Sequence, residues 1–119
     1  MNRSIPPLEE AITDFWNANR APEEVRRFSS DLVKGTIDNL DRIDNIIGEN
    51  ATNWKIDRIA LVDKNILRVA IYELLHRDDI PSAVTINEAV EIAKKFSTPR
   101  SGNFVNGILD KVKEKNIVK

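Results

Sequence analysis

Residues 61–75 read LVDKNILRVAIYELL, and this stretch indicates a helical fold class. Its apolar side chains lie on most faces of a helix, which is typical of a central helix packed by neighbours on several sides. Four charged residues interrupt the run, so it does not suit a membrane-spanning helix: they are Asp63, Lys64, Arg68 and Glu73. The helix should end at 76–79, because Pro81 prevents its continuation.

Helical periodicity continues on the N-terminal side of this stretch. An apolar stripe at helical spacing predicts a helix over Leu8–Trp16. A single long helix is expected over 23–47, with Pro22 in its first turn and Gly48 at its end. A short helix around 53–58 should lead into the central one.

Two further helices are predicted after the central one. Thr85-Ile86-Asn87-Glu88 has the form of a capping box, and the helix it opens should bury Ile86, Ala89, Val90, Ala93 and Phe96. Thr98-Pro99 is a second start signal, and the last helix carries Phe104, Val105, Ile108 and Val112 on one face. The expected fold is an all-α bundle of five main helices, forming one domain over 1–119 with helical subdomains at 1–50 and 51–119.

Composition narrows the function. The 119 residues include no cysteine and one histidine, which excludes disulfides and thiolate metal sites and argues against a Ser–His triad. Neither a phosphate-binding glycine loop nor a catalytic constellation is present, so we expect no enzyme, no cofactor and no metal. The N-terminus lacks the apolar core of a signal peptide, which makes a cytoplasmic location the expectation.

Charge is distributed unevenly along the chain. The net charge is −1, but residues 94–119 contain seven basic and two acidic side chains. Such a basic end is either a footprint for nucleic acid or a solvated helix. The turn before the last helix offers basic, amide and aromatic groups that suit single-stranded RNA: Lys94, Lys95, Arg100, Ser101, Asn103 and Phe104. The alternative is that Phe104 is an inward core residue.

Several ordered segments carry a family resemblance. They are DKNILRVAIYELL at 63–75, DIP at 79–81, INEAVEIAKKF at 86–96, Ser101, and FVNGILD at 104–110. Together they resemble the bacterial transcription antitermination factors of the NusB family. The resemblance implies an all-α fold of two small helical bundles. It also implies binding of boxA RNA together with the ribosomal protein NusE, within the elongation complex that transcribes ribosomal RNA.

The resemblance also implies site residues. Phe104 matches the RNA-contacting aromatic of the family, and Arg100 and Asn103 lie in the same RNA-facing turn. Asp63 matches an acidic position that faces NusE. Arg68 and Glu73 match motif positions whose role is divided between helix packing and RNA. The residues expected to bind RNA are therefore Arg68, Lys95, Arg100, Ser101, Asn103 and Phe104.

The sequence departs from the family at two places. Pro99-Arg100 replaces acidic residues, and Asn103 stands where lysine is frequent, so the positive charge of the turn is moved. The family also begins with an arginine-rich helix that has no counterpart before Leu8. We therefore expect a shortened chain that self-associates through the surface left uncovered. The alternative function is a protein-interaction module that binds NusE but has lost most of its RNA affinity.

Overall fold

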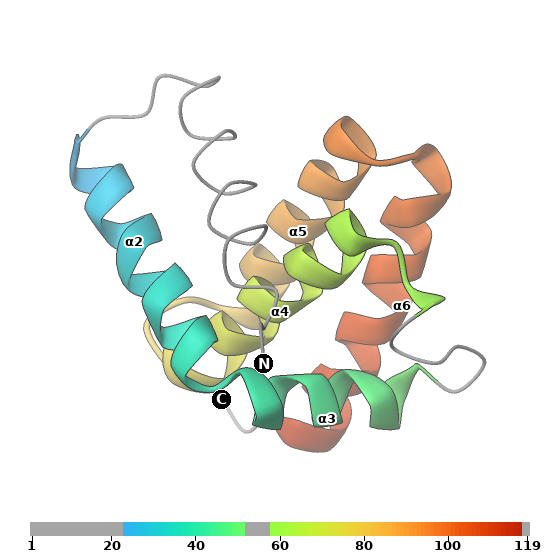
Figure 1. Cartoon of the computed structure of the whole chain (residues 1–119), viewed down its shortest axis with the longest axis horizontal. Helices are drawn as coiled ribbons and strands as arrows, with labels where there is room; N and C mark the ends of the chain where they lie inside the picture. The colour runs from blue at the N-terminus through green and yellow to red at the C-terminus, as the bar shows by residue number, and fades with distance from the viewer. Residues whose placement is uncertain (1–22, 52–57, 118–119) are drawn as a thin grey trace.

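The computed structural model describes residues 23–51 and 58–117. In these residues every regular element is a helix, as predicted: α2 (Glu23–Asp38), α3 (Leu40–Asn50), α4 (Leu61–His76), α5 (Ser82–Phe96) and α6 (Pro99–Asn116) (Figure 1). The helix predicted over Leu8–Trp16 lies outside the described residues, as do residues 53–57 of the short helix. The described helices are all too short or too polar to span a bilayer.

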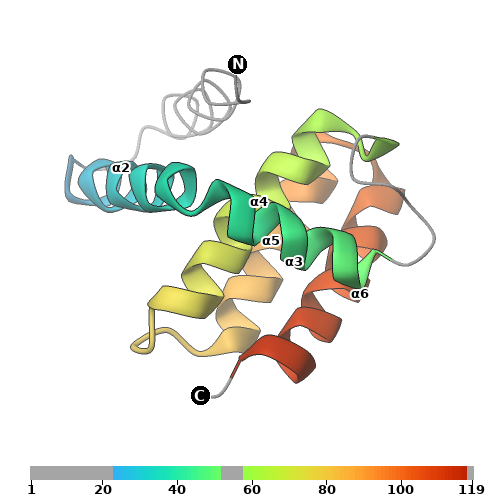
Figure 2. The same cartoon turned by 60° about the horizontal axis from the view of Figure 1, so that its bottom comes forward.

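The predicted central position of α4 is confirmed. It contacts α2, α3, α5 and α6, and its Leu67 and Ile71 are fully buried. Figure 2 shows α3 crossing in front of α4, with α5 and α6 behind. One core cluster joins the C-terminal helices to α3, and its largest fully buried members are Ile43, Ile47, Leu67, Ile71, Leu74, Val105, Leu109 and Val112.

The prediction of one helix over 23–47 is wrong, because the helix breaks at Asn39. The carbonyl oxygen of Gly35 accepts both the Asn39 backbone N–H (3.1 Å) and the Asn39 side-chain amide (2.8 Å). An asparagine side chain that bonds to the backbone competes with helix continuation. The chain changes direction here, and in Figure 1 α3 starts at the lower end of α2 and runs along the bottom of the molecule, at a steep angle to α2. α3 then continues past the expected stop at Gly48 to Asn50.

The start of α5 also differs from the prediction. The helix begins at Ser82, directly after Pro81, so Thr85 lies inside the first turns instead of capping them. Thr85 is buried, and its hydroxyl donates to the carboxylate of Glu73 on α4. Phe96, predicted to point inward, is 42% exposed at the last position of α5.

The predicted start of α6 is confirmed. Thr98 is the N-cap, its Oγ1 accepts the Ser101 N–H (3.2 Å), and proline follows at the first helical position. Ser97 and Thr98 alone connect α5 to α6, so the two helices pack as an antiparallel pair (Figure 1).

Candidate nucleic-acid interface

The first two turns of α6 bring together four of the residues predicted to bind RNA: Arg100, Ser101, Asn103 and Phe104. Ser101 is buried, so a direct RNA contact by Ser101 does not fit the structure. Arg100 and Asn103 are exposed, whereas Phe104 is half-buried and packs against the core cluster. Successive helical residues are about 100° apart, so Phe104 lies between exposed Arg100 and buried Ser101 around the helix axis. The expectation that Phe104 packs inward is therefore met in part, because the side chain contacts the core cluster but stays half-exposed. Its contact with RNA stays a prediction.

The end of α5 adds positive charge beside this turn. Lys95 is exposed, and its Nζ lies 5.5 Å from the ring centroid of Phe96. Lys94 pairs with Glu91 across one helical turn, at 3.4 Å. The structure thus places two cations and an exposed aromatic ring next to the first turn of α6.

Gly102 allows α5 and α6 to approach closely at this end, a role that the sequence analysis missed. A Cβ added at Gly102 would lie 2.8 Å from Cγ of Lys94, so the aliphatic stem of Lys94 occupies the space of the absent side chain. The sequence carries one signal of this close approach: Gly102 lies in the first turns of a predicted helix, where neither a turn nor a helix cap requires a glycine.

Arg68 lies in the interior, at the contact between α3 and α4. It is 4% exposed, and its Nε and Nη2 donate to the two carboxylate oxygens of Asp44 at 2.8 and 2.9 Å. Its Nη1 donates to Asn65 at 3.0 Å. The Arg68 guanidinium group, already hydrogen-bonded to Asp44 and Asn65, exposes almost no surface to a ligand, so a direct RNA contact by Arg68 does not fit the structure. Its role in RNA binding stays a prediction and would have to be indirect.

Asp63 and Ser101 are buried against each other, at 7% and 6% exposure. The Ser101 hydroxyl donates to Oδ2 of Asp63 at 2.9 Å. The expectation that the Asp63 carboxylate faces a protein partner therefore does not match its position, because the acceptor is turned toward the α5–α6 turn. Its neighbours Leu61 and Val62 are the exposed residues at this end of α4, at 46% and 38%.

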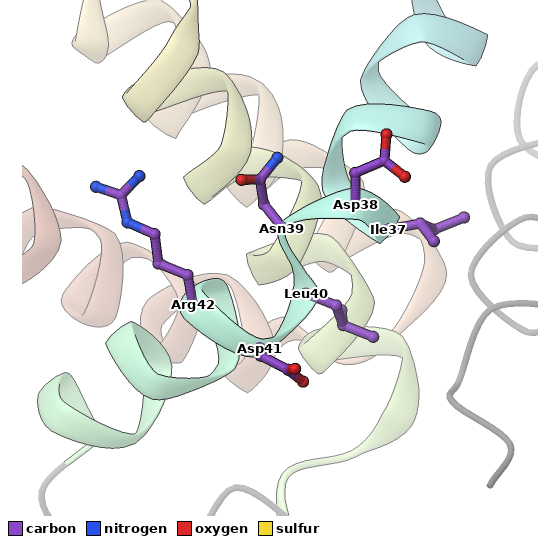
Figure 3. Close-up of a pocket in the computed structure, with 6 residues that line it drawn as sticks. All are labelled: Ile37, Asp38, Asn39, Leu40, Asp41 and Arg42. Atoms are coloured by element: carbon purple, nitrogen blue, oxygen red, sulfur yellow. The ribbon is translucent and has the colours of Figure 1, made fainter.

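A hollow of about 400 Å³ lies at the α2–α3 break, away from the α5–α6 turn. It is lined by Ile37, Asp38, Asn39, Leu40, Asp41 and Arg42. Figure 3 shows the charged ends of Asp38, Asp41 and Arg42 pointing in different directions, so they do not converge on one ligand. Within the described residues, no three acidic or histidine side chains are grouped to hold a metal ion.

Comparison with known proteins identifies the family. The model of the NusB family matches residues 4–114. The chain belongs to the NusB family. It is 50% identical over 112 residues to the transcription antitermination protein NusB of Thermodesulfovibrio yellowstonii, an alignment covering 92% of this chain and 74% of that relative.

Solved structures show the NusB fold. T. maritima NusB superposes with a TM-score of 0.79 at 32% identity, covering 99% of this chain and 96% of the other. A chain from a structure of antitermination factors NusB and NusE in complex with double-stranded RNA has a TM-score of 0.73 at 23% identity, covering 86% and 76%. The prediction of an all-α NusB-like bundle is confirmed.

Proposed function

We propose that this chain is a transcription antitermination factor of the bacterial cytoplasm. In this role it binds boxA-type RNA together with the ribosomal protein NusE, within the elongation complex that transcribes ribosomal RNA. Membership of the NusB family supports the proposal, as does the activity in the name of its 50% identical relative. A structure of the same fold that holds NusB, NusE and RNA is in keeping with these partners. The proposal assigns binding and no catalysis.

One observation carries the RNA part of the proposal: half-buried Phe104 lies beside exposed Arg100 and Asn103 in the first two turns of α6. A ring held by the core on one side is already ordered, so stacking a base on it immobilises little else. Arg100, Lys95 and the positive end of the α6 dipole attract phosphate. Exposed Asn103 offers both a donor and an acceptor to a base edge.

Salt-dependent RNA binding tests this proposal. The probe is a fluorescently labelled single-stranded boxA-type RNA, with a scrambled RNA of equal length for comparison. We expect Arg100→Ala to weaken binding and to reduce the salt slope by about 0.7, the contribution of one phosphate contact on a single strand.

Lys113→Ala is the matched control, because Lys113 is exposed in the last turn of α6 and its removal changes the net charge equally. It should leave both affinity and salt slope unchanged. Equal effects of the two variants would refute a localised RNA site, and no preference for boxA over scrambled RNA would refute the proposed specificity.

A protein-interaction module that binds NusE alone is the second candidate. Exposed Leu61 and Val62 at the start of α4 favour it, because neighbouring exposed apolar residues are suited to a protein contact. Calorimetric titrations with NusE alone and with RNA alone separate the two candidates. Binding of NusE without measurable RNA affinity would select the interaction module.

A further inference from the structure

We propose that Asp63 is a positioning residue for the RNA-binding turn. Its buried carboxylate holds Ser101 and thereby sets the rotation of the first two turns of α6, which present Arg100, Asn103 and Phe104. This inference rests on the proposed RNA-binding function, and it assigns Asp63 a role inside the protein instead of a direct contact with a partner.

The contacts form one connected network of hydroxyl groups and a carboxylate. Ser101 Oγ donates to Asp63 Oδ2 at 2.9 Å, and it lies 2.8 Å from Ser97 Oγ and 3.1 Å from Thr98 Oγ1. The Ser101 backbone N–H donates to Thr98 Oγ1 at 3.2 Å. Since the Ser101 hydroxyl has a single proton, which goes to the carboxylate, the hydroxyls of Ser97 and Thr98 can donate to Ser101 Oγ. Asp63 thus orders the whole connection from α5 to α6.

The position of Ser101 explains how this network controls the exposed residues. Ser101 follows Arg100 directly and lies two and three residues before Asn103 and Phe104. A helix turns by about 100° per residue, so fixing Ser101 toward α4 fixes the direction of the other three side chains. Loss of the tether would leave the first turn held by the Thr98 cap and by the packing of Phe104 and Val105.

The network is not what stability alone would favour. Oδ1 of Asp63 is buried and has no hydrogen-bond partner among the described residues, although Oδ2 is paired. A buried carboxylate with an unpaired oxygen carries a desolvation penalty that a well-packed apolar pair avoids. Its negative charge, kept close to a turn proposed to bind phosphate, is also electrostatically unfavourable. A positioning role accounts for an acid at this place.

Substitutions that separate charge from hydrogen bonding test the inference. Asp63→Ala and Asp63→Asn remove the same charge, but only asparagine keeps an oxygen that can accept the Ser101 proton. We expect Asp63→Ala and Ser101→Ala each to weaken binding of the labelled boxA-type RNA about ten-fold, the scale of one charge-assisted hydrogen bond. Asp63→Asn should retain most of the affinity. The double variant Asp63→Ala/Ser101→Ala should bind no more weakly than the weaker single variant.

Thr85→Ala is the matched control. Thr85 also donates a hydroxyl proton to a carboxylate of α4, that of Glu73, but it does so near the start of α5. Its loss should lower stability without changing RNA affinity. If Thr85→Ala weakens RNA binding as much as Ser101→Ala, or if Ser101→Ala binds as tightly as the wild type, the inference is refuted.

A second readout is independent of RNA. Amide hydrogen exchange at residues 101–104 should become about ten-fold faster in Ser101→Ala and Asp63→Ala, and it should stay unchanged in Thr85→Ala. This result would support the role of Asp63 in positioning residues 101–104 even if the wild type bound no RNA. Absence of RNA binding by the wild type would refute only the proposed function. Unchanged exchange in Ser101→Ala would overturn the inference, and this variant remains decisive if Asp63→Ala fails to fold.

Discussion

Gly35→Ala is expected to separate α2 from α4. A Cβ placed on Gly35 would lie 2.1 Å from Cζ and 2.2 Å from Oη of Tyr72 on α4. Carbon atoms in favourable contact are about 3.5–4.0 Å apart, so the ring or the helix would have to move by about 1.5 Å. The Tyr72 ring stacks on His76 with the centroids 4.6 Å apart, so a movement of the ring would disturb this contact.

Two opposing effects set the magnitude. Alanine is the better helix former by about 1 kcal/mol. Overpacking costs about 1–3 kcal/mol and occasionally more, and three atoms of the Tyr72 side chain would lie within 2.6 Å of the new methyl group. We therefore expect the free energy of unfolding to fall by about 2 kcal/mol, which lowers Tm by an amount on the order of 10 °C in a domain of this size.

Thermal and urea unfolding, followed by circular dichroism, measure this effect. Gly48→Ala and Gly107→Ala are matched controls, because a Cβ at either position meets no atom within 4 Å. Both should stabilise the protein by about 0.5–1 kcal/mol. In a Tyr72→Ala background, Gly35→Ala should change from destabilising to neutral or stabilising. A Gly35→Ala variant as stable as Gly48→Ala would refute the close approach of α2 and α4.

Two other substitutions test the assignment of side chains to core or ligand. Phe104→Leu keeps an apolar side chain for the core but removes the ring, so RNA affinity should fall by about 1–3 kcal/mol with little loss of stability, whereas Phe104→Ala should lose both. If anisotropy titrations show that a stable Phe104→Leu protein binds RNA with wild-type affinity, Phe104 has only a structural role in the core. Arg68→Ala leaves Asp44 and Asn65 without their partner. Urea unfolding should show that the free energy of unfolding falls by about 2–4 kcal/mol. This value is near the lower limit for a buried ion pair, because the Asp44 side chain is 28% exposed. Combining Arg68→Ala with Asp44→Ala should be markedly less than additive, and an additive result would show that the pair contributes no coupling energy.

The helical class, the central helix and the start of α6 could all be predicted from the amino-acid sequence. Each depends on residues close together in the chain. The apolar run at 61–75 predicts burial on several sides, and Thr98-Pro99 supplies a cap and a preset first turn within two residues. The segments at 63–75, 86–96 and 104–110 also indicated the family, which the match over residues 4–114 confirms.

The inward-facing polar side chains could be identified only from the folded structure. Arg68, Ser101 and Thr85 find their carboxylate partners 24, 38 and 12 positions away along the chain. Helical periodicity indicates that such residues share a helix face with apolar ones, but it does not indicate which residues of the neighbouring helices lie opposite them. From the sequence alone, an arginine or a serine can therefore be interpreted as a ligand contact. The packing of α3, α4 and α6 shows its actual partner. A buried polar group needs such a partner, because its desolvation is offset only by hydrogen bonds that the folded chain brings together.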